Sequence, residues 1–398
     1  MTSDFPLQAS VTAAFADDFN LAESAPDLPT ITKALNDDLL LVEAWADRKN
    51  LVIAPSKSSV TLFTPDPAQY KFHPQVFYKG TLLPLNQKPK NLGCNLDPQL
   101  IYSNHTSIQA PRASGREQIM KAVCGSTWGQ DKETLLTTYK GLVRPLIEYA
   151  VAIWQPNVSP TSILRLQRVQ NSALRTATGC HMRTSIDHLH AECKILKVDQ
   201  HIDLLASQFL ANALTPDHPS HGVVTLPLGP RSKKHTLYSK NIAAVSPYLR
   251  DGIIPPSNYK KVVSSLHTAA VSAALRASAP NKLLGVHPPD INPEEETLSR
   301  PHRCVLTQLR ADECHRLKSY MHAIGKSTDD LCPECGLTSQ SVSHLFECPS
   351  FPTVLTIRDL WSHPWDSAVF ISSLPSFVGH LPPVVPLPPL PIPPEPPP

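Results

Sequence analysis

The most constraining feature of this sequence is a set of four metal-ligating residues near its C-terminal end. Cys332 and Cys335 have two residues between them, and His344 and Cys348 follow with three residues between them. Three thiolates and one imidazole can close a tetrahedral Zn²⁺ site that has no open coordination position. A Cys pair followed closely by a well-spaced His/Cys pair rarely arises by accident. The spacing therefore predicts a small domain folded around one structural zinc ion.

The sequence around these ligands also predicts their local geometry. Pro333 and Gly336 favour a tight knuckle whose backbone N–H groups point at thiolate sulfur. The His344/Cys348 spacing would place both ligands on one face of a helix. The nearby Cys304, Cys314 and His315 are alternative ligands, but their spacing fits no compact knuckle.

A second feature is a pair of adjacent carboxylates, Asp17 and Asp18, between two strand-like runs at 9–15 and 19–22. This pattern predicts a tight hairpin with both carboxylates at its tip. Like charges this close repel one another and raise each other's pKa unless a cation lies between them. A divalent, oxygen-preferring ion such as Mg²⁺ is the usual partner, and such ions run phosphoryl transfer in polymerases.

The hydrophobic pattern predicts an α+β first part and helices after it. A helix is expected from about Leu28 to Trp45, because apolar residues recur there at helical spacing. Short strands are expected at 59–64, 75–78, 81–85 and 92–96. Helices are then expected at 135–149, 161–178, 260–277 and about 301–324, with 216–260 loop-like.

These expectations divide the 398 residues into six regions. The excess of Pro, 42 residues against 14 Gly, favours extended connections and a tail of polyproline II or solvated coil. The predicted regions are a β-rich part at 1–100, a helical part at 101–215, a Pro-rich linker with short helices at 216–295, a helix plus zinc domain at 296–350, an extension at 351–380 and the Pro-rich tail at 381–398.

Positive charge gathers in the expected helical part. Residues 101–185 carry ten Lys and Arg against four Asp and Glu, whereas residues 1–100 carry eight against eleven. On the helix expected at 161–178, Arg165, Arg168 and Arg175 form a stripe that could follow a phosphate backbone. The alternative is an ordinary solvated helix face.

Cellular location is constrained by what the sequence lacks. No run of 18 apolar residues predicts a membrane span, and no basic start with an apolar core predicts a secretory signal. Nine scattered Cys favour a reducing compartment over a disulfide framework. We therefore expect an intracellular protein, in the nucleus or cytoplasm; its oligomeric state does not follow from the sequence.

Several stretches, in the correct order, resemble the C-terminal half of a non-LTR (LINE-like, jockey-type) retrotransposon reverse transcriptase. The hairpin with Asp17 and Asp18 resembles polymerase motif C, the segment up to Lys57-Ser58 resembles motif D, and 91–97 resembles the primer-grip strand. The 139–179 region, including Arg144, Glu148, Gln167 and Asn171, resembles the helical thumb. The segment 306–310 and the Cys/His cluster resemble the zinc-bearing C-terminus of the same elements.

The resemblance implies an RNA-directed DNA polymerase that acts on an RNA template and a DNA primer. It implies a partial palm, a helical thumb and a small zinc domain. Asp17 and Asp18 would bind catalytic Mg²⁺, Lys57 would lie near the incoming nucleotide, and the arginine stripe would face the template–primer duplex.

The sequence lacks one carboxylate that polymerase chemistry requires. Two-metal phosphoryl transfer needs a further carboxylate from another strand. In the family this residue belongs to motif A, which precedes the hairpin, and residues 1–14 offer only Asp4 and no fingers. We therefore expect a truncated polymerase that is inactive alone but still binds nucleic acid and zinc. The alternative is a zinc-dependent module that binds nucleic acid or protein without an enzymatic role.

Overall fold

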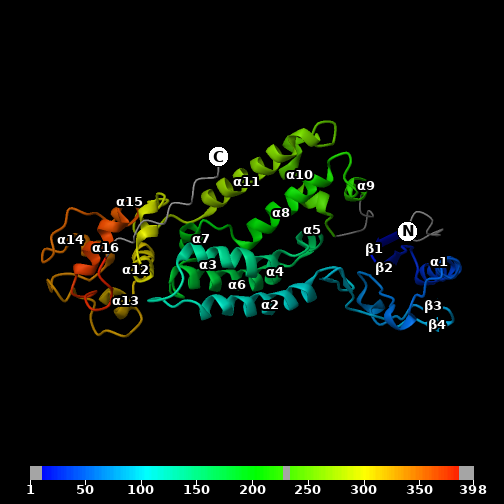
Figure 1. The fold of residues 1–398 in the computed structure, drawn as a ribbon, viewed down its shortest axis with the longest axis horizontal. Helices are drawn as coiled ribbons and strands as arrows, with labels where there is room; N and C mark the ends of the chain where they lie inside the picture. Colours follow the sequence, from blue (N-terminus) through cyan, green and yellow to red (C-terminus); the bar gives the residue numbers. More distant parts are fainter. Residues whose placement is uncertain (1–10, 227–233, 385–398) are drawn as a thin grey trace, which may run out of the picture. The chain divides into compact units, whose positions relative to one another are not determined.

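The computed structural model describes residues 11–226 and 234–384 of the chain. It divides into two compact units, Met1–His105 and Thr106–Pro398, and each is considered by itself (Figure 1). Strands lie in the first unit and helices dominate the second, so the α+β class is confirmed. Asp4, residues 9–10 of the expected first strand and residues 385–398 of the Pro-rich tail lie outside the described residues.

The hairpin that carries the paired carboxylates forms as expected. Strand β1 (Val11–Phe15) pairs antiparallel with β2 (Asp18–Ala22), and Phe15 lies opposite Asp18. Ala16 turns the chain with a φ of 53°, in the left-handed region. Asp17 therefore lies in the turn, whereas Asp18 is the first residue of the returning strand.

The long helix after the hairpin is also confirmed, as α1 (Leu28–Arg48). The Asp27 side chain caps its N-terminus by accepting from the Thr30 N–H at 2.9 Å, and Pro29 fits the first turn. Val42 is buried against the short strands that follow, and the buried Trp45 ring contacts Phe19 of β2 edge to face, with the ring centroids 6.1 Å apart.

Those strands are shorter than expected and do not join the hairpin in one sheet. The described strands of the first unit form three separate two-stranded ladders. The run at 59–64 contributes only a bridge at Val60, and the run expected at 92–96 is a strand only at Cys94–Asn95. Leu92 and Gly93 both take positive φ there and turn the chain between two strands. The later strands are β3 (Phe77–Tyr78), β4 (Thr81–Leu82), β5 (Lys90–Asn91) and β6 (Cys94–Asn95).

The first half of the second unit is helical, as expected. The helix predicted at 135–149 is split by a π-helical turn at Tyr139–Val143, just before Pro145. The helix predicted at 161–178 forms and ends at Gly179, whose φ is 74°. The helices are α2 (Ser103–Ala122), α3 (Lys132–Thr138), α4 (Arg144–Glu148), α5 (Val151–Trp154), α6 (Pro160–Thr178), α7 (Ile186–Cys193) and α8 (Val198–Ala213).

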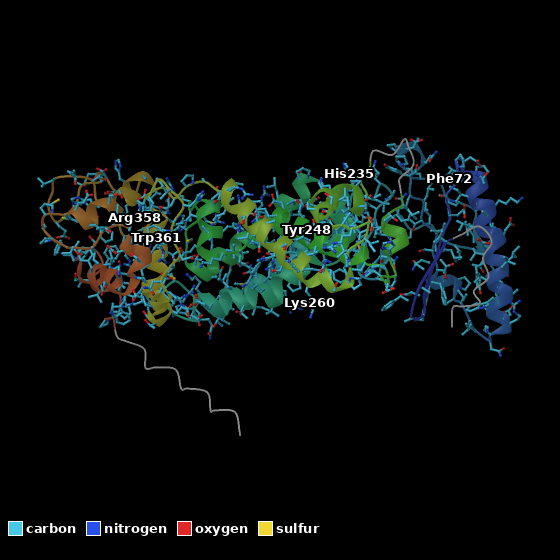
Figure 2. The ribbon with its side chains drawn as sticks, turned by 90° about the horizontal axis from the view of Figure 1, so that it is seen from above. Phe72, His235, Tyr248, Lys260, Arg358 and Trp361 are labelled. Carbon is cyan, nitrogen blue, oxygen red and sulfur yellow. The ribbon has the colours of Figure 1, made fainter. Side chains whose placement is uncertain are left out.

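The described residues of 216–260, which are 216–226 and 234–260, differ from the expected loop. They include α9 (His221–Val224) and α10 (Leu237–Val245), and α11 (Tyr259–Ala277) follows as predicted. Val245, Ile254 and Leu266 are buried against α8, and Tyr248 packs on the same core (Figure 2). Apolar side chains scattered among polar ones therefore make this segment part of the helical unit.

The last part of the second unit surrounds a separate apolar core. The single helix expected at 301–324 is wrong, because Asp312 takes a φ of 56° and the chain leaves the helix there. Leu309, Trp361 and Phe377 are buried in this core, and Figure 2 labels Trp361. The helices are α12 (Arg300–Arg310), α13 (Lys318–Ala323), α14 (Val342–Glu347), α15 (Asp359–Ser362) and α16 (Pro364–Ser373).

Short 3-10 turns complete the connections, at Pro55–Lys57, Pro67–Gln69, Gln155–Asn157, Ser246–Tyr248, Pro256–Asn258 and Pro293–Thr297. No helix among the described residues is both long enough and apolar enough to cross a membrane.

A buried ion-pair network ties the last helices to the earlier ones. Arg310 of α12 is fully buried, and its guanidinium contacts Glu192 of α7 at 3.0 Å and Glu295 at 2.5 Å. Lys132 of α3 contacts the same two carboxylates at 3.2 and 3.1 Å. The network links α3, α7, α12 and the 293–297 turn within one unit.

Candidate metal centre and nucleic-acid interface

The first two candidate ligands lie in a tight loop between 330 and 340. The Cys332 N–H donates to the Thr338 carbonyl at 2.7 Å, and the Gly336 N–H donates to the Cys332 carbonyl at 2.9 Å. Gly336 has a φ of 65°, which a residue without a Cβ adopts at little cost. The loop therefore holds the Cys332 and Cys335 side chains on the same side of the turn, as the sequence predicted.

The other two ligands lie at α14. Ser341 caps this helix by accepting from the His344 N–H at 3.2 Å, which fixes where the helix begins. His344 lies within the helix. Cys348 follows the last helical residue in extended backbone, with φ −66° and ψ 121°. The expectation that both ligands lie on a helix is therefore correct only for His344.

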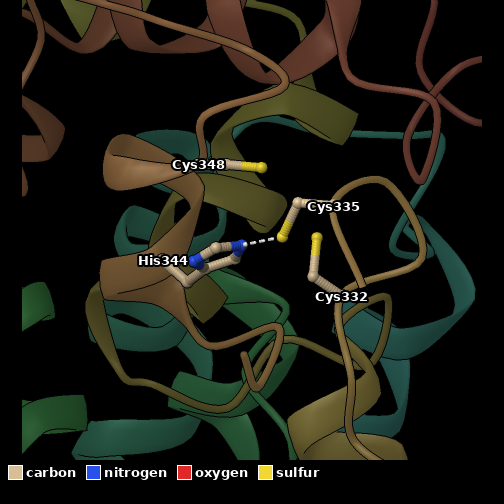
Figure 3. Close-up of side chains that lie close together, drawn as sticks. All are labelled: Cys332, Cys335, His344 and Cys348. Carbon is tan, nitrogen blue, oxygen red and sulfur yellow. Dashed lines mark hydrogen bonds between the residues drawn. The ribbon is translucent and has the colours of Figure 1, made fainter. Parts of the chain in front are cut away.

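The four side chains meet in one cluster (Figure 3). One ligand atom from each of Cys332, Cys335, His344 and Cys348 lies within 4.8 Å of all the others. The Cys335 Sγ and His344 Nε2 atoms are 3.3 Å apart. Tetrahedral zinc with ordinary bond lengths separates sulfur from sulfur by about 3.8 Å and sulfur from nitrogen by about 3.5 Å. The donor set and its spacing fit a zinc ion.

Neighbouring groups orient these ligands. Thr338 Oγ1 lies 2.9 Å from His344 Nδ1, so the hydroxyl oxygen can accept from the Nδ1–H and leave Nε2 free for a metal. The Leu337 N–H donates to the Cys335 sulfur at 3.5 Å and lowers the pKa of that thiol. Burial raises the pKa of the Cys332 thiol. Thr338 is a contact that the ligand spacing alone did not predict.

The alternative ligands do not join the cluster. Cys304 and Cys314 are buried, and His315 contacts His181 and Gln308. The Cys304 side chain lies against Gly179, where an added Cβ would come within 2.5 Å of the sulfur. Within 11–226 and 234–384, no second group of three or more metal-ligating side chains is found.

Asp17 and Asp18 are exposed, and among the described residues they belong to no group of three or more metal-ligating side chains. Lys57 lies at the end of a 3-10 turn and is also exposed. The structure places the two carboxylates next to each other on the hairpin, and no third metal-ligating side chain from 11–226 or 234–384 groups with them.

The predicted arginine stripe on α6 is not uniform. Arg168 is exposed and Arg165 is half-buried. The Arg175 guanidinium donates to the carbonyls of three residues that follow the helix, His181, Met182 and Thr184, at 3.2 to 3.5 Å. Arg175 therefore holds the loop after α6.

Helix α2 packs beside α6 and extends its positive charge. The buried Glu117 carboxylate of α2 accepts from Ser172 at 3.1 Å and from Thr176 at 3.2 Å, both on α6. Glu117 is the one acidic residue on the two helices, which carry six basic residues. We define the basic face as the five of these that do not cap the α6 loop, namely Arg112, Arg116, Lys121, Arg165 and Arg168.

The chain is similar to polymerases of mobile elements. It is 26% identical over 220 residues to the probable RNA-directed DNA polymerase from transposon X-element of Drosophila melanogaster. The matched region covers 53% of this chain and 24% of that protein. The corresponding protein from transposon BS of the same species is 24% identical over 217 residues, covering 52% and 24%. The RNA-directed DNA polymerase from mobile element jockey of Drosophila funebris is 27% identical over 226 residues, covering 52% and 23%.

These relatives confirm the resemblance to non-LTR retrotransposon RNA-directed DNA polymerases. The chain spans about a quarter of the length of each of these relatives. No protein-family model matches the chain, and no solved structure matches it.

Proposed function

We propose that this chain is the nucleic-acid-binding, zinc-stabilised part of a mobile-element RNA-directed DNA polymerase. The observation that carries the proposal is the basic face on α2 and α6, in a chain similar to proteins that copy RNA into DNA. The proposed partners are an RNA template and a DNA primer. In this proposal the first unit corresponds to part of the palm and α2–α8 to the thumb, and the six-region division remains a prediction.

The Cys332/Cys335/His344/Cys348 cluster is proposed to hold one Zn²⁺ with a structural role. A closed set of three thiolates and one imidazole leaves no position for a substrate or a reactive water. The ion would hold the 330–340 loop against α14. Mg²⁺ would belong to the intact polymerase site, to which Asp17, Asp18 and Lys57 are proposed to contribute. All nine Cys are unbridged, which supports a location in the nucleus or cytoplasm.

Replacing Arg165 and Arg168 together with Ala is expected to weaken binding to an RNA template annealed to a DNA primer. Each phosphate contact releases close to one counterion, so losing two should cost on the order of 30-fold in affinity near 0.1 M salt. Fluorescence anisotropy with a labelled template–primer measures this change. Arg175 remains a predicted contact with a smaller expected effect, because its guanidinium already contacts three carbonyls.

A matched control removes two exposed arginines elsewhere in the same unit, Arg250 and Arg276. This double Ala variant loses the same charge but leaves the basic face intact, so we expect it to keep affinity within about threefold of the original chain. Equal losses in both variants would mean that only net charge matters and would contradict the proposed interface.

The 398 residues by themselves are expected to show no primer extension on an RNA template with Mg²⁺. Asp17 and Asp18 are exposed, and two-metal transfer requires a further bridging carboxylate. A gel assay with labelled primer and nucleotides tests this. Extension that disappears in Asp17→Ala would show that the chain forms a complete catalytic site, and would refute this part of the proposal.

The second candidate function is a zinc-dependent module that binds protein or nucleic acid without any role in polymerisation. The metal cluster is compatible with both functions. This candidate would be favoured if the original chain retains zinc but binds template–primer no better than the Arg165→Ala/Arg168→Ala variant.

A further inference from the structure

An exposed tryptophan projects from the loop between α2 and α3. Trp128 has 56% of its surface exposed, whereas Trp45, Trp154 and Trp361 are buried and Trp365 is half-buried. A single exposed apolar side chain is ordinary on a protein surface. Trp128 differs from such a residue in the way its loop is held and in the positive charge of the helix that precedes it.

The loop that carries Trp128 is held in one conformation by backbone contacts. The Gly125 N–H donates to the Trp128 carbonyl at 2.9 Å, and Cys124 and Gly129 form an antiparallel bridge. Gly129 takes a φ of 93°, and an added Cβ there would come within 2.4 Å of a backbone oxygen. The turn thus requires glycine at this position.

A buried arginine from α12 fixes both ends of the same loop. Arg300 donates from Nε to the Gly125 carbonyl at 2.6 Å and from Nη1 to the Gln130 carbonyl at 3.0 Å. It also contacts the Thr176 carbonyl of α6 at 2.7 Å, so the loop is anchored to the helix beside α2. The indole is therefore presented by a rigid support.

The ring itself is positioned by Gly125. A Cβ added at Gly125 would lie 2.5 Å from the Trp128 Nε1 atom, so the indole lies directly against that backbone. One side of the side chain is supported while more than half of its surface remains in solvent. A preorganised aromatic ring loses little conformational entropy when a partner stacks on it.

The surroundings of the loop favour a nucleic acid as this partner. The loop follows α2 directly, and Lys121 of the basic face lies in the last turn of that helix, where its side chain is 45% exposed and its ammonium group pairs with Glu117 at 3.0 Å. The two nearest acidic residues in sequence are already engaged. Asp131 caps α3 by accepting from the Thr134 N–H at 2.8 Å, and Glu133 pairs with Arg303 at 2.5 Å.

We propose that Trp128 stacks on an unpaired base of a nucleic acid whose backbone lies along the basic face. Basic residues of α2 and α6 would contact the phosphates of the strand, and the indole would stack on one base at the point where the strand leaves the duplex. This combination of a basic track and an aromatic platform is the way proteins bind single strands without sequence preference. The inference rests on the nucleic-acid binding proposed above.

The test compares a 20-nucleotide single-stranded RNA with a blunt RNA–DNA duplex of the same length. Trp128→Ala is expected to weaken binding of the single strand by about 5- to 100-fold, the usual effect of losing one stacked base, and to leave the blunt duplex almost unchanged. Trp128→Phe is expected to retain most of the affinity. Intrinsic fluorescence should be quenched by the single strand in the original chain and much less in Trp128→Phe.

Leu275→Ala serves as the control, because Leu275 on α11 is 57% exposed and lies outside the basic face. If the original chain binds RNA in a salt-dependent way but Trp128→Ala binds the single strand equally well, the stacking role is wrong and the proposed function stands. That result would be expected if the indole contacts a protein. If the original chain binds neither probe, both proposals fail.

Discussion

Replacing Arg310 with Ala is expected to lower the free energy of unfolding of the Thr106–Pro398 unit by about 3–5 kcal/mol. Removing one partner of a buried ion pair leaves an uncompensated charge in the interior, and this is the usual size of the penalty. Here Glu192 and Glu295 are both almost fully buried, so neither carboxylate can turn to water. Denaturant unfolding followed by circular dichroism measures the change.

Two further variants show whether the loss of stability comes from the charge and hydrogen bonds of Arg310. Arg310→Lys keeps the charge but loses the planar guanidinium that also donates to the Leu360 carbonyl at 2.8 Å, so we expect only partial recovery. Arg358→Ala removes an exposed arginine near the same core (Figure 2) and should change stability by less than about 0.5 kcal/mol. A loss below about 1 kcal/mol for Arg310→Ala would show that the network does not hold these helices together.

The same network predicts how stability depends on pH. Burial would raise the pKa of the Glu192 carboxyl, but Arg310 and Lys132 attract the charged form more strongly and hold that pKa below its usual value. A lowered folded-state pKa contributes stability that is present above the unfolded value of about 4.5 and is lost as the pH falls below it. The acid dependence should be weaker in Arg310→Ala than in the original chain.

Removing zinc is expected to unfold the 330–340 loop and to loosen the end of α14 next to Cys348. Structural zinc contributes about 10–16 kcal/mol of binding energy in small zinc domains, and without the ion the ligand thiols repel one another once deprotonated. The loop is held mainly by backbone hydrogen bonds and the cluster itself, whereas Val342, Leu345 and Phe346 of α14 are packed into the apolar core of the unit. Hydrogen exchange with and without a strong chelator should show loss of protection there first.

The Cys332→Ser variant tests the same zinc site by removing one ligand. We expect one zinc per chain in the original protein and a large loss of zinc in the variant, measured by atomic emission on purified protein. Cys94→Ser, which changes a buried Cys of the first unit, should keep its zinc and serves as the matched control. Full zinc retention in Cys332→Ser, or a metal-free original chain, would contradict the proposed centre.

The sequence predicted the features that depend on local pattern. Apolar spacing located the ends of α1, α6 and α11 to within three residues, because each helix has an amphipathic face and terminal signals. The Cys/His spacing predicted the cluster, since few conformations of a short loop and a helix can bring four such ligands together.

The features that sequence did not predict depend on contacts between distant residues. Nothing near Arg310 in the sequence indicates that its partners are Glu192 and Glu295, which are 118 and 15 residues away. The helix α10 was missed because the Pro-rich and polar residues around it predict a loop, whereas packing on α8 stabilises it. Gln167 and Asn171, which carry part of the family resemblance, are buried and bond to His190.

Residues that carry the family resemblance also make contacts inside the helical unit. Several of the residues that match the family hold the helical unit together, including Arg144 and Glu148, which pair with each other at 2.7 Å. They do not belong to the basic face. These residues therefore stabilise the helical unit, and the resemblance at their positions does not identify the residues that contact nucleic acid.

The most direct test of the central proposal is the salt dependence of binding between the full chain and an RNA template annealed to a DNA primer. If the basic face contacts phosphates, the logarithm of the affinity should fall linearly with the logarithm of salt concentration, with a slope of about −2 to −4 for three to five contacts. The Arg165→Ala/Arg168→Ala variant should have a slope shallower by between about 1 and 2. An affinity that does not change with salt, or a slope that is the same in both proteins, would contradict the account.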